Sequence, residues 1–178
     1  MRKIANSELG RVAIQDYRNM NRSRHVVVLD NIRSAMNVGS IFRTADAFGI
    51  DALFLCGITA TPPSREMEKT ALGATASVPW RYFASSAEAL LHLKTLNYLI
   101  VGIEQLDQSI SLEQHKPAEG QACAFVFGNE VHGLSDNILD LLDAGVEIPQ
   151  FGSKHSFNVA VSAGIIMWHY LMCLSQKG

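Results

Sequence analysis

Short apolar runs alternate along this chain with segments in which apolar residues recur every three or four positions. A run of β-branched and aliphatic residues bounded by polar or turn residues is typical of a buried strand, and recurrence at helical spacing predicts a helix. The predicted strands are 25–32, 51–57, 80–83, 97–104, 122–128 and a short last one in "GVEIP" (145–149).

The helical pattern is clearest in "SAMNVGSIFRTADAFGI" (34–50), where five apolar residues fall on one face. A second helix begins at the capping box formed by Ser85 and Glu88. A third is expected from Ser135 through Leu142, ended by Gly145, and an apolar helix closes the chain. Segment 58–79 is expected to be irregular, with Pro62–Pro63 as a breaker and Gly73 as a turn. The predicted core positions are Val38, Ile41, Phe42, Ala45 and Phe48 in the first helix and Leu90, Leu91, Leu93 and Leu96 in the second.

The alternation of strands and helices predicts the fold class. The 178 residues suffice for one α/β domain with a mainly parallel sheet flanked by helices. Ligands of open α/β sheets bind beyond the carboxyl ends of the strands. The loops after Leu29, Phe127 and Ile148 are therefore expected to carry the chemistry.

Charge is distributed unevenly, although the formal net charge is only −2. Residues 1–24 hold six basic and two acidic side chains, whereas the remainder holds nine basic and fifteen acidic ones. We therefore expect a basic N-terminal arm (1–24), helical in conformation, and one further domain (25–178). The arm predicts either a polyanionic partner or a helix with a solvated basic face.

Two features bear on the compartment. The three cysteines (Cys56, Cys123 and Cys173) stand far apart in apolar surroundings, which predicts reduced thiols, a cytoplasmic location and no zinc site. Residues 155–176 carry no formal charge and are long enough to cross a bilayer, but polar residues spread along them favour a buried helix. No membrane association is expected.

In the first loop region, Arg43 lies opposite the apolar face of its helix. It either pairs with Asp46 one turn on, as ordinary surface charges do, or is aimed at a substrate. Asn37 is expected to precede this helix and cap it. Gly39 permits close approach of another backbone or a ligand.

The second loop, "FVFGNEVHGLS", follows a buried strand. Gly128 and Gly133 have P-loop spacing, but Leu134 stands where that motif needs lysine, which excludes a P-loop NTPase. Glu130 could orient a cation, accept a substrate proton or simply stay solvated. A loop histidine such as His132 is more often a surface residue than a base.

The third loop, "EIPQFGSKHSFNVAVSAG", leads into the final helix. Pro149 and Gly152 shape the loop, and Ser156 and Asn158 open the helix. Their plain role is capping, but two such residues leave one polar group free to hold something else.

Together, "NIRSAMNVGSIFRTADAFG", "FVFGNEVHGLS" and "IPQFGSKHSFNVAVSAG" resemble, in order and spacing, the three signature motifs of SpoU-type (TrmH-like) RNA ribose 2′-O-methyltransferases of the SPOUT superfamily. "TPPSREMEKTALGA" resembles this family's loop between its second and third strands. The resemblance covers roughly residues 25–174, and three ordered motifs are far more specific than one.

The resemblance implies a C-terminal deep trefoil knot, S-adenosylmethionine as the cofactor, no metal, and a homodimer built on the last helix. Phe157 replaces a frequent leucine, and His155 stands where glutamine is common, so its role stays open. The implied catalytic residues are Asn37, Arg43, Glu130, Ser156 and Asn158. The implied cofactor-binding residues are Phe127, Gly128, Ile148, Phe157 and Asn158.

For the reaction, the resemblance implies that Arg43 is the base that takes the proton of the ribose 2′-hydroxyl, a role that its chemistry disfavours. Because a guanidinium rarely gives up its proton, we expect it to donate hydrogen bonds to a phosphate and to the developing alkoxide. Transfer RNA is the expected substrate because the chain is little more than the catalytic domain; ribosomal RNA is the alternative. A non-catalytic RNA-binding module and a small-molecule methyltransferase or nucleotide-binding enzyme are the competing functions.

Overall fold

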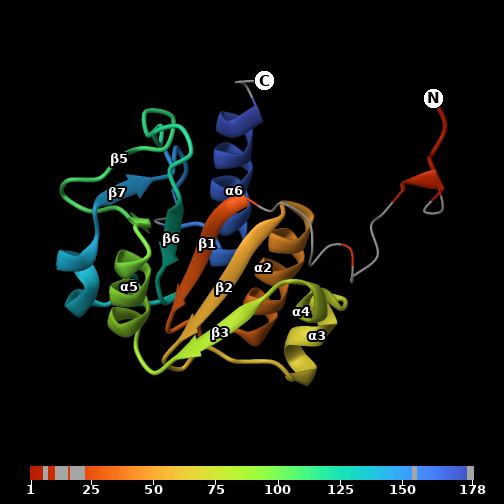
Figure 1. Cartoon of the computed structure of the whole chain (residues 1–178), viewed down its shortest axis with the longest axis horizontal. Coiled ribbons are helices and arrows are strands. Elements are labelled where there is room, and N and C mark those ends of the chain that lie inside the picture. Colours follow the sequence, from red (N-terminus) through yellow and green to blue (C-terminus); the bar gives the residue numbers. More distant parts are fainter. Residues whose placement is uncertain (6–7, 11–15, 17–22, 154–155, 176–178) are drawn as a thin grey trace.

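The fold is built on one parallel sheet (Figure 1). The computed structural model describes residues 1–5, 8–10, 16, 23–153 and 156–175, so most of the helix expected in the arm (1–24) lies outside the described residues. Within them, seven strands follow the order β3-β2-β1-β6-β4-β7-β5, and all neighbouring pairs are parallel. They are β1 (Ser23–Asp30), β2 (Ile50–Cys56), β3 (Trp80–Phe83), β4 (Leu99–Ile103), β5 (Ile110–Ser111), β6 (Cys123–Phe127) and β7 (Ala144–Glu147). The predicted parallel α/β fold is confirmed.

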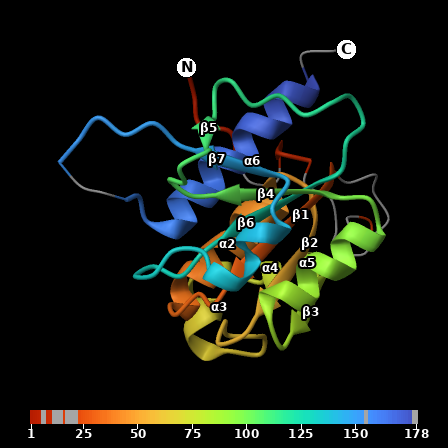
Figure 2. The same ribbon diagram turned by 90° about the vertical axis from the view of Figure 1, so that its left-hand side faces the viewer.

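Helices cover both faces of the sheet (Figure 2). On one face, alternate residues of β1 such as Val27 and Leu29 pack against four helices. On the other, Val26 and Val28 pack against one α-helix and one 3₁₀ helix. The first group is α2 (Ala35–Ala47), α3 (Arg65–Ala71), α4 (Ala74–Ser77) and α6 (Val159–Ser175); the second is α5 (Ser86–Thr95) and η2 (Asp136–Leu141).

Helix α2 forms as its pattern predicts, with one correction. Four of its five predicted core residues, among them Ile41 and Phe42, are fully buried, whereas Phe48 at the C-cap is only partly buried. The cap is Ser34, whose hydroxyl accepts from the backbone N–H of Asn37 (3.3 Å). Asn37 therefore lies in the first turn rather than before the helix, and its amide is free for another role.

Segment 58–79 was expected to be irregular, and this prediction is wrong. It contains α3 and α4, with Ser64 capping α3. Close packing explains the difference, because a Cβ on Gly39 of α2 would lie 2.2 Å from the Met67 carbonyl oxygen. Tertiary contact with α2 thus stabilises helices that are too short to show a periodic pattern.

Three smaller predictions are also corrected. In α5, Leu90 and Leu93 are buried as expected, but Leu91 and Leu96 are more than half exposed. The predicted third helix is the short 3₁₀ helix η2, and Ser135, just before it, donates hydrogen bonds to Asp30 at the end of β1. Gly145 lies inside β7 and not at a helix end.

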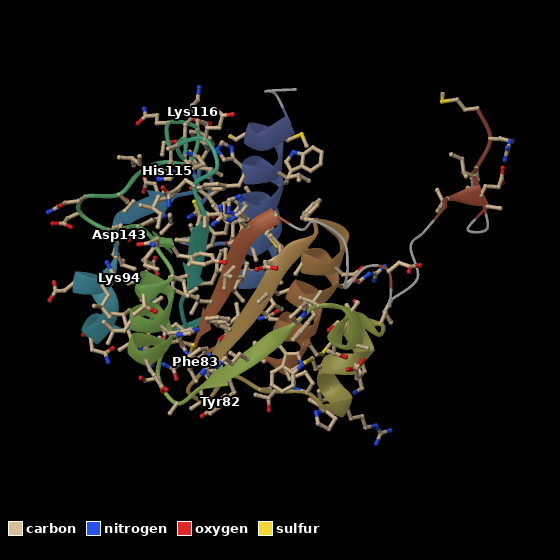
Figure 3. The ribbon with its side chains drawn as sticks, in the orientation of Figure 1. Tyr82, Phe83, Lys94, His115, Lys116 and Asp143 are labelled. Atoms are coloured by element: carbon tan, nitrogen blue, oxygen red, sulfur yellow. The ribbon has the colours of Figure 1, made fainter. Side chains whose placement is uncertain are left out.

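One salt bridge links α5 to the segment before β7, and the three cysteines are free thiols. Lys94 of α5 lies 2.8 Å from Asp143, just before β7 (Figure 3). Cys56 and Cys123 are buried and free, whereas Cys173 is only half-buried. Among the described residues, no helix is both long enough and apolar enough to cross a membrane.

Candidate active site

A cavity of about 330 Å³ opens at the carboxyl end of the sheet. It is bordered by the ends of β4, β6 and β7 and by the first turn of α6. In parallel sheets this edge gathers the loops that bind ligands. The lining residues are Ile103, Glu104, Gln105, Phe127, Gly128, Asn129, Glu130, Glu147, Ile148, Gln150, Ser156, Phe157, Asn158, Val159 and Ser162.

The five residues predicted to bind the cofactor all line this cavity. At position 128 only a glycine fits, because the backbone of Gly133 and Leu134 occupies the place of a side chain. A Cβ there would lie 2.1 Å from the carbonyl carbon of Gly133 and 2.3 Å from the backbone N of Leu134. The loop after β6 therefore folds back on itself and leaves its backbone against the cavity.

Glu130 is held by the start of α2. One carboxylate oxygen accepts from the backbone N–H of Arg33 (2.9 Å), and the other from Ser34 (3.1 Å) and the Asn37 side-chain amide (3.0 Å). Partial burial raises the pKa of the Glu130 carboxyl, but these hydrogen bonds lower it by more, so the net pKa lies below its ordinary value. The carboxylate serves as an anion at a helix N-terminus.

Asn37 extends this contact to α6. Its Oδ1 accepts from the Asn158 side-chain amide (3.2 Å), and Asn158 Oδ1 in turn accepts from the backbone N–H of Ala160 (2.9 Å). Glu130, Asn37 and Asn158 thus form a hydrogen-bonded chain, which we call the relay. The relay joins the three loops that the sequence singled out.

Arg43 lies outside the cavity lining, on the exposed side of α2. No ion pair joins it to Asp46, which accepts a hydrogen bond from the Ser77 hydroxyl instead. Among the described residues, nothing accepts a hydrogen bond from the Arg43 guanidinium. Arg43 and Asp46 are therefore not joined at salt-bridge distance, and the guanidinium presents five N–H donors on the exposed side of α2.

A buried carboxylate supports the loop from below, and the sequence analysis missed it. Asp30, at the end of β1, is fully buried and accepts from the backbone N–H of Ser135 (2.8 Å), from Asn31 Nδ2 (2.9 Å) and from the Ser86 hydroxyl. Asn129 donates to the Asn31 carbonyl (2.7 Å), which fixes the start of the Glu130 loop. The sequence did contain a signal for this role, because Asp30 is a charged residue at the end of an otherwise apolar strand.

The cavity's second wall was also missed. Glu104 and Gln105 follow β4, while Glu147 and Gln150 flank the end of β7. The rule that ligands bind beyond strand ends applies to β4 as much as to β1 and β6, so it could have identified this wall.

Three further residues were considered as site residues from the sequence, and the structure describes two of them. Ser156 is exposed and lines the cavity, His132 is an exposed loop residue, and His155 lies outside the described residues. Within the part of the chain that the structure describes, no three His, Cys, Asp or Glu side chains are grouped to hold a metal ion.

Comparison with known proteins agrees with this geometry. Residues 24–168 match the model of the SpoU rRNA Methylase family. The chain is 31% identical over 149 residues to the 23S rRNA (guanosine-2′-O-)-methyltransferase RlmB of Neisseria meningitidis, covering 84% of this chain and 58% of that protein. It is 32% identical over 150 residues to the mouse tRNA (guanosine(18)-2′-O)-methyltransferase TARBP1, covering 83% of this chain and 9% of that protein.

Solved structures are similar over most of the chain. The A. aeolicus TrmH/SpoU tRNA modifying enzyme superimposes with a TM-score of 0.81 at 25% identity, covering 93% of this chain and 84% of that one. AviRb of Streptomyces viridochromogenes, solved in complex with AdoMet, gives a TM-score of 0.79 at 25% identity, covering 91% and 65%.

The chain spans about three fifths of the length of the first two curated relatives it matches. The family match, by contrast, runs across nearly the whole sheet and includes all three loops joined by the relay. The resemblance that the sequence motifs indicated is confirmed, and the chain belongs to the SpoU rRNA Methylase family.

Proposed function

We propose that this protein transfers a methyl group from S-adenosylmethionine to a ribose 2′-hydroxyl of RNA. The observation that carries the proposal is the relay, because it holds three separate loops around one cavity and next to the helix of Arg43. A non-catalytic RNA-binding module would have no need for a ligand cavity at the carboxyl ends of the strands.

The cavity suits such a cofactor. Its volume of about 330 Å³ falls within the range of about 300–1,000 Å³ that is usual for small-molecule sites. Ile103, Phe127 and Ile148 supply apolar surface for an adenine ring, and the backbone at Gly128 is open to it. The AdoMet complex of the similar AviRb supports this choice. When bound, the cofactor supplies a methyl group that its sulfonium has already made electrophilic.

The residues of this chain then have to bring a weak nucleophile into line and stabilise the charge that develops on it. Arg43 donates hydrogen bonds to an RNA phosphate and to the 2′-oxygen as it loses its proton. Glu130 holds the N-terminus of α2, and so fixes where that helix presents Arg43. Asn37 and Asn158 tie this helix to the cofactor loop, and Ser156 faces the cavity.

For the RNA, we propose tRNA, with rRNA as the alternative. The A. aeolicus enzyme, which this chain covers to 84%, is a tRNA modifying enzyme, whereas the Neisseria relative is named for 23S rRNA. We assign RNA contact to the basic arm (1–24) and catalysis to residues 25–178. The cytoplasmic location stays a prediction from the cysteines.

Two structural features of the family belong to the same proposal. The segment after β6 forms a deep trefoil knot. Family membership supports it, and so does the path of α6, which returns from β7 to the face of the sheet that α2 covers.

The chain forms a homodimer through α6, where Val161 and Trp168 are about half exposed on one side of the helix. Sedimentation tests this: W168E should convert a species of twice 19.5 kDa into a monomer. A wild-type monomer at micromolar concentration contradicts it.

Methyl transfer is tested with S-adenosylmethionine carrying a labelled methyl group. Incubation with total tRNA, total rRNA and a metabolite extract should label tRNA and leave the extract unlabelled. The labelled RNA should contain an alkali-resistant dinucleotide, because a 2′-O-methyl group blocks cleavage at that position. Label in the extract alone would support a small-molecule methyltransferase and contradict the proposal.

A further inference from the structure

The wall of the cavity formed by β4 and β7 carries two carboxylates that the proposed function has not used. Glu104 follows Ile103 at the end of β4, and Glu147 ends β7. The register pairs Gly102 with Gly145 and Ile103 with Val146, so the next positions, Glu104 and Glu147, are neighbours on adjacent strands. Neighbouring positions of paired strands project to the same side of a sheet.

Within the part of the chain that the structure describes, no basic side chain forms a salt bridge with either carboxylate. Glu104 Oε1 accepts only from the backbone N–H of the next residue, Gln105 (3.1 Å). Its Oε2 packs over Gly133, where a Cβ would lie 2.4 Å away. Among the described residues, nothing donates to the Glu147 carboxylate. Both residues are half-buried, and like charges on neighbouring strands destabilise a sheet.

The other described residues of the cavity lining offer no counter-charge. None of the described residues that line it is Lys, Arg or His, and its third carboxylate, Glu130, already accepts three hydrogen bonds. The described lining is therefore acidic, which disfavours nucleotides that carry phosphates and favours a cation. Glu130 is committed to the scaffold, so the carboxylates available to a ligand are Glu104 and Glu147.

We infer that Glu104 and Glu147 are the counter-charge for the positive sulfur of the cofactor, and that they make the site bind the charged methyl donor more tightly than its neutral-sulfur product. The inference rests on the proposed function. Transfer breaks the bond from sulfur to methyl and forms the bond from oxygen to methyl, while the hydroxyl proton passes to solvent. The sulfonium becomes a thioether, so the attraction disappears when the reaction is complete and product release is favoured.

The test is calorimetry of the full-length protein with S-adenosylmethionine and S-adenosylhomocysteine, which differ by the methyl group and the charge on sulfur. Wild type should bind the first more tightly. E104Q and E147Q should each reduce the affinity ratio about threefold to tenfold, because one half-buried charge pair is lost. The double variant should bring the ratio near one. E119Q, which removes an exposed carboxylate outside the cavity, is the matched control and should leave the ratio unchanged.

A cofactor analogue with an ammonium-bearing carbon in place of the sulfonium sharpens the result, since it should follow S-adenosylmethionine in every variant. Thermal unfolding confirms that each variant is folded. If the glutamine variants weaken both ligands equally, the carboxylates bind a group common to both, such as the ribose hydroxyls, and the inference fails while the proposed function stands. If wild type binds neither ligand, both fail.

Discussion

Polar side chains lie at both ends of the strands of the parallel sheet, which we call the carboxyl edge and the amino edge. The surroundings of these side chains differ between the two. At the carboxyl edge, the relay residues Glu130 and Asn158 are exposed, hydrogen-bonded and next to a cavity. At the amino edge, His25 is only 3% exposed and lies against Phe125 and Tyr170. Its Nδ1 accepts from the backbone N–H of Cys123 (3.3 Å), and no described residue pairs with Nε2.

The amino edge continues into a second buried contact. The hydroxyl of Tyr170 lies 2.6 Å from Nδ1 of His115, which Figure 3 places near the end of α6. The rings of Tyr170 and Phe125 are 4.3 Å apart. These groups fasten α6 to the sheet. The polar groups at the carboxyl ends of the strands line a cavity, whereas those at the amino ends are buried between α6 and the sheet, so substitutions at the two ends should have different effects.

The largest effect is expected from R43A. Arg43 is exposed and outside the cavity lining, so folding and cofactor affinity should stay near wild type. Methyl transfer should fall about 10²–10³-fold, the usual loss for one transition-state donor. Single-turnover assays with calorimetry check this, and R81A on edge strand β3 serves as the matched control. Full turnover by R43A would remove Arg43 from the mechanism.

The amino edge should govern how stability depends on pH. Burial lowers the pKa of His25 from 6.5 to about 4. The folded state therefore favours neutral His25, and its stabilising effect is complete above pH 6.5 and is lost as the pH falls from 6.5 toward 4. At pH 5 the loss should be about 2 kcal/mol in the free energy of unfolding.

Urea unfolding at pH 7.5 and pH 5 measures this loss for wild type and for H25N, whose side-chain oxygen can replace Nδ1 as the acceptor. H25N should lose less stability on acidification and should bind the cofactor like wild type at pH 7.5. Equal losses in the two proteins would show that His25 does not control this pH dependence. Altered cofactor affinity would show that the two edges are not independent.

The smallest effect is expected from E130Q. Glutamine keeps the size of the side chain but places an amide among donors, so unfolding should become easier by about 1–2 kcal/mol. Since the pKa of Glu130 is lowered in the fold, its contribution is present above the unfolded value of about 4.3 and is lost as the pH falls through the folded value. The difference in melting temperature between the two proteins should therefore vanish in acid. A constant difference down to pH 3 would contradict a charged role.

Much of this arrangement could be predicted from the sequence, because it depends on local patterns. Strands such as 122–128 were visible as apolar runs, and the face of α2 that buries Phe42 was visible from its spacing. The ordered motifs also identified every residue of the relay. What they could not indicate was which atoms meet, since the bond from Asn158 to Asn37 joins residues 121 positions apart.

Other features depend on tertiary packing and left weaker traces. Helices α3 and α4 are stabilised by packing against α2, which a propensity pattern cannot register. The acidic wall needs both the register of β4 on β7 and the strand order of the sheet, neither of which a single sequence provides. In the sequence Asp30 resembles any residue that ends a strand, because its four hydrogen bonds come from the distant Ser86 and Ser135 as well as from Asn31.

We propose that the methyl donor binds in the cavity at the carboxyl ends of the strands and that Arg43, outside the cavity lining, contacts the RNA. A crystal structure of the protein with S-adenosylmethionine tests this most directly. We predict that the adenine packs against Phe127 and Ile148 and that the sulfonium lies beside Glu104 and Glu147. The methyl group should point toward the opening on the side of α2, the helix that carries Arg43. A donor bound anywhere else in a fully liganded crystal would contradict the account.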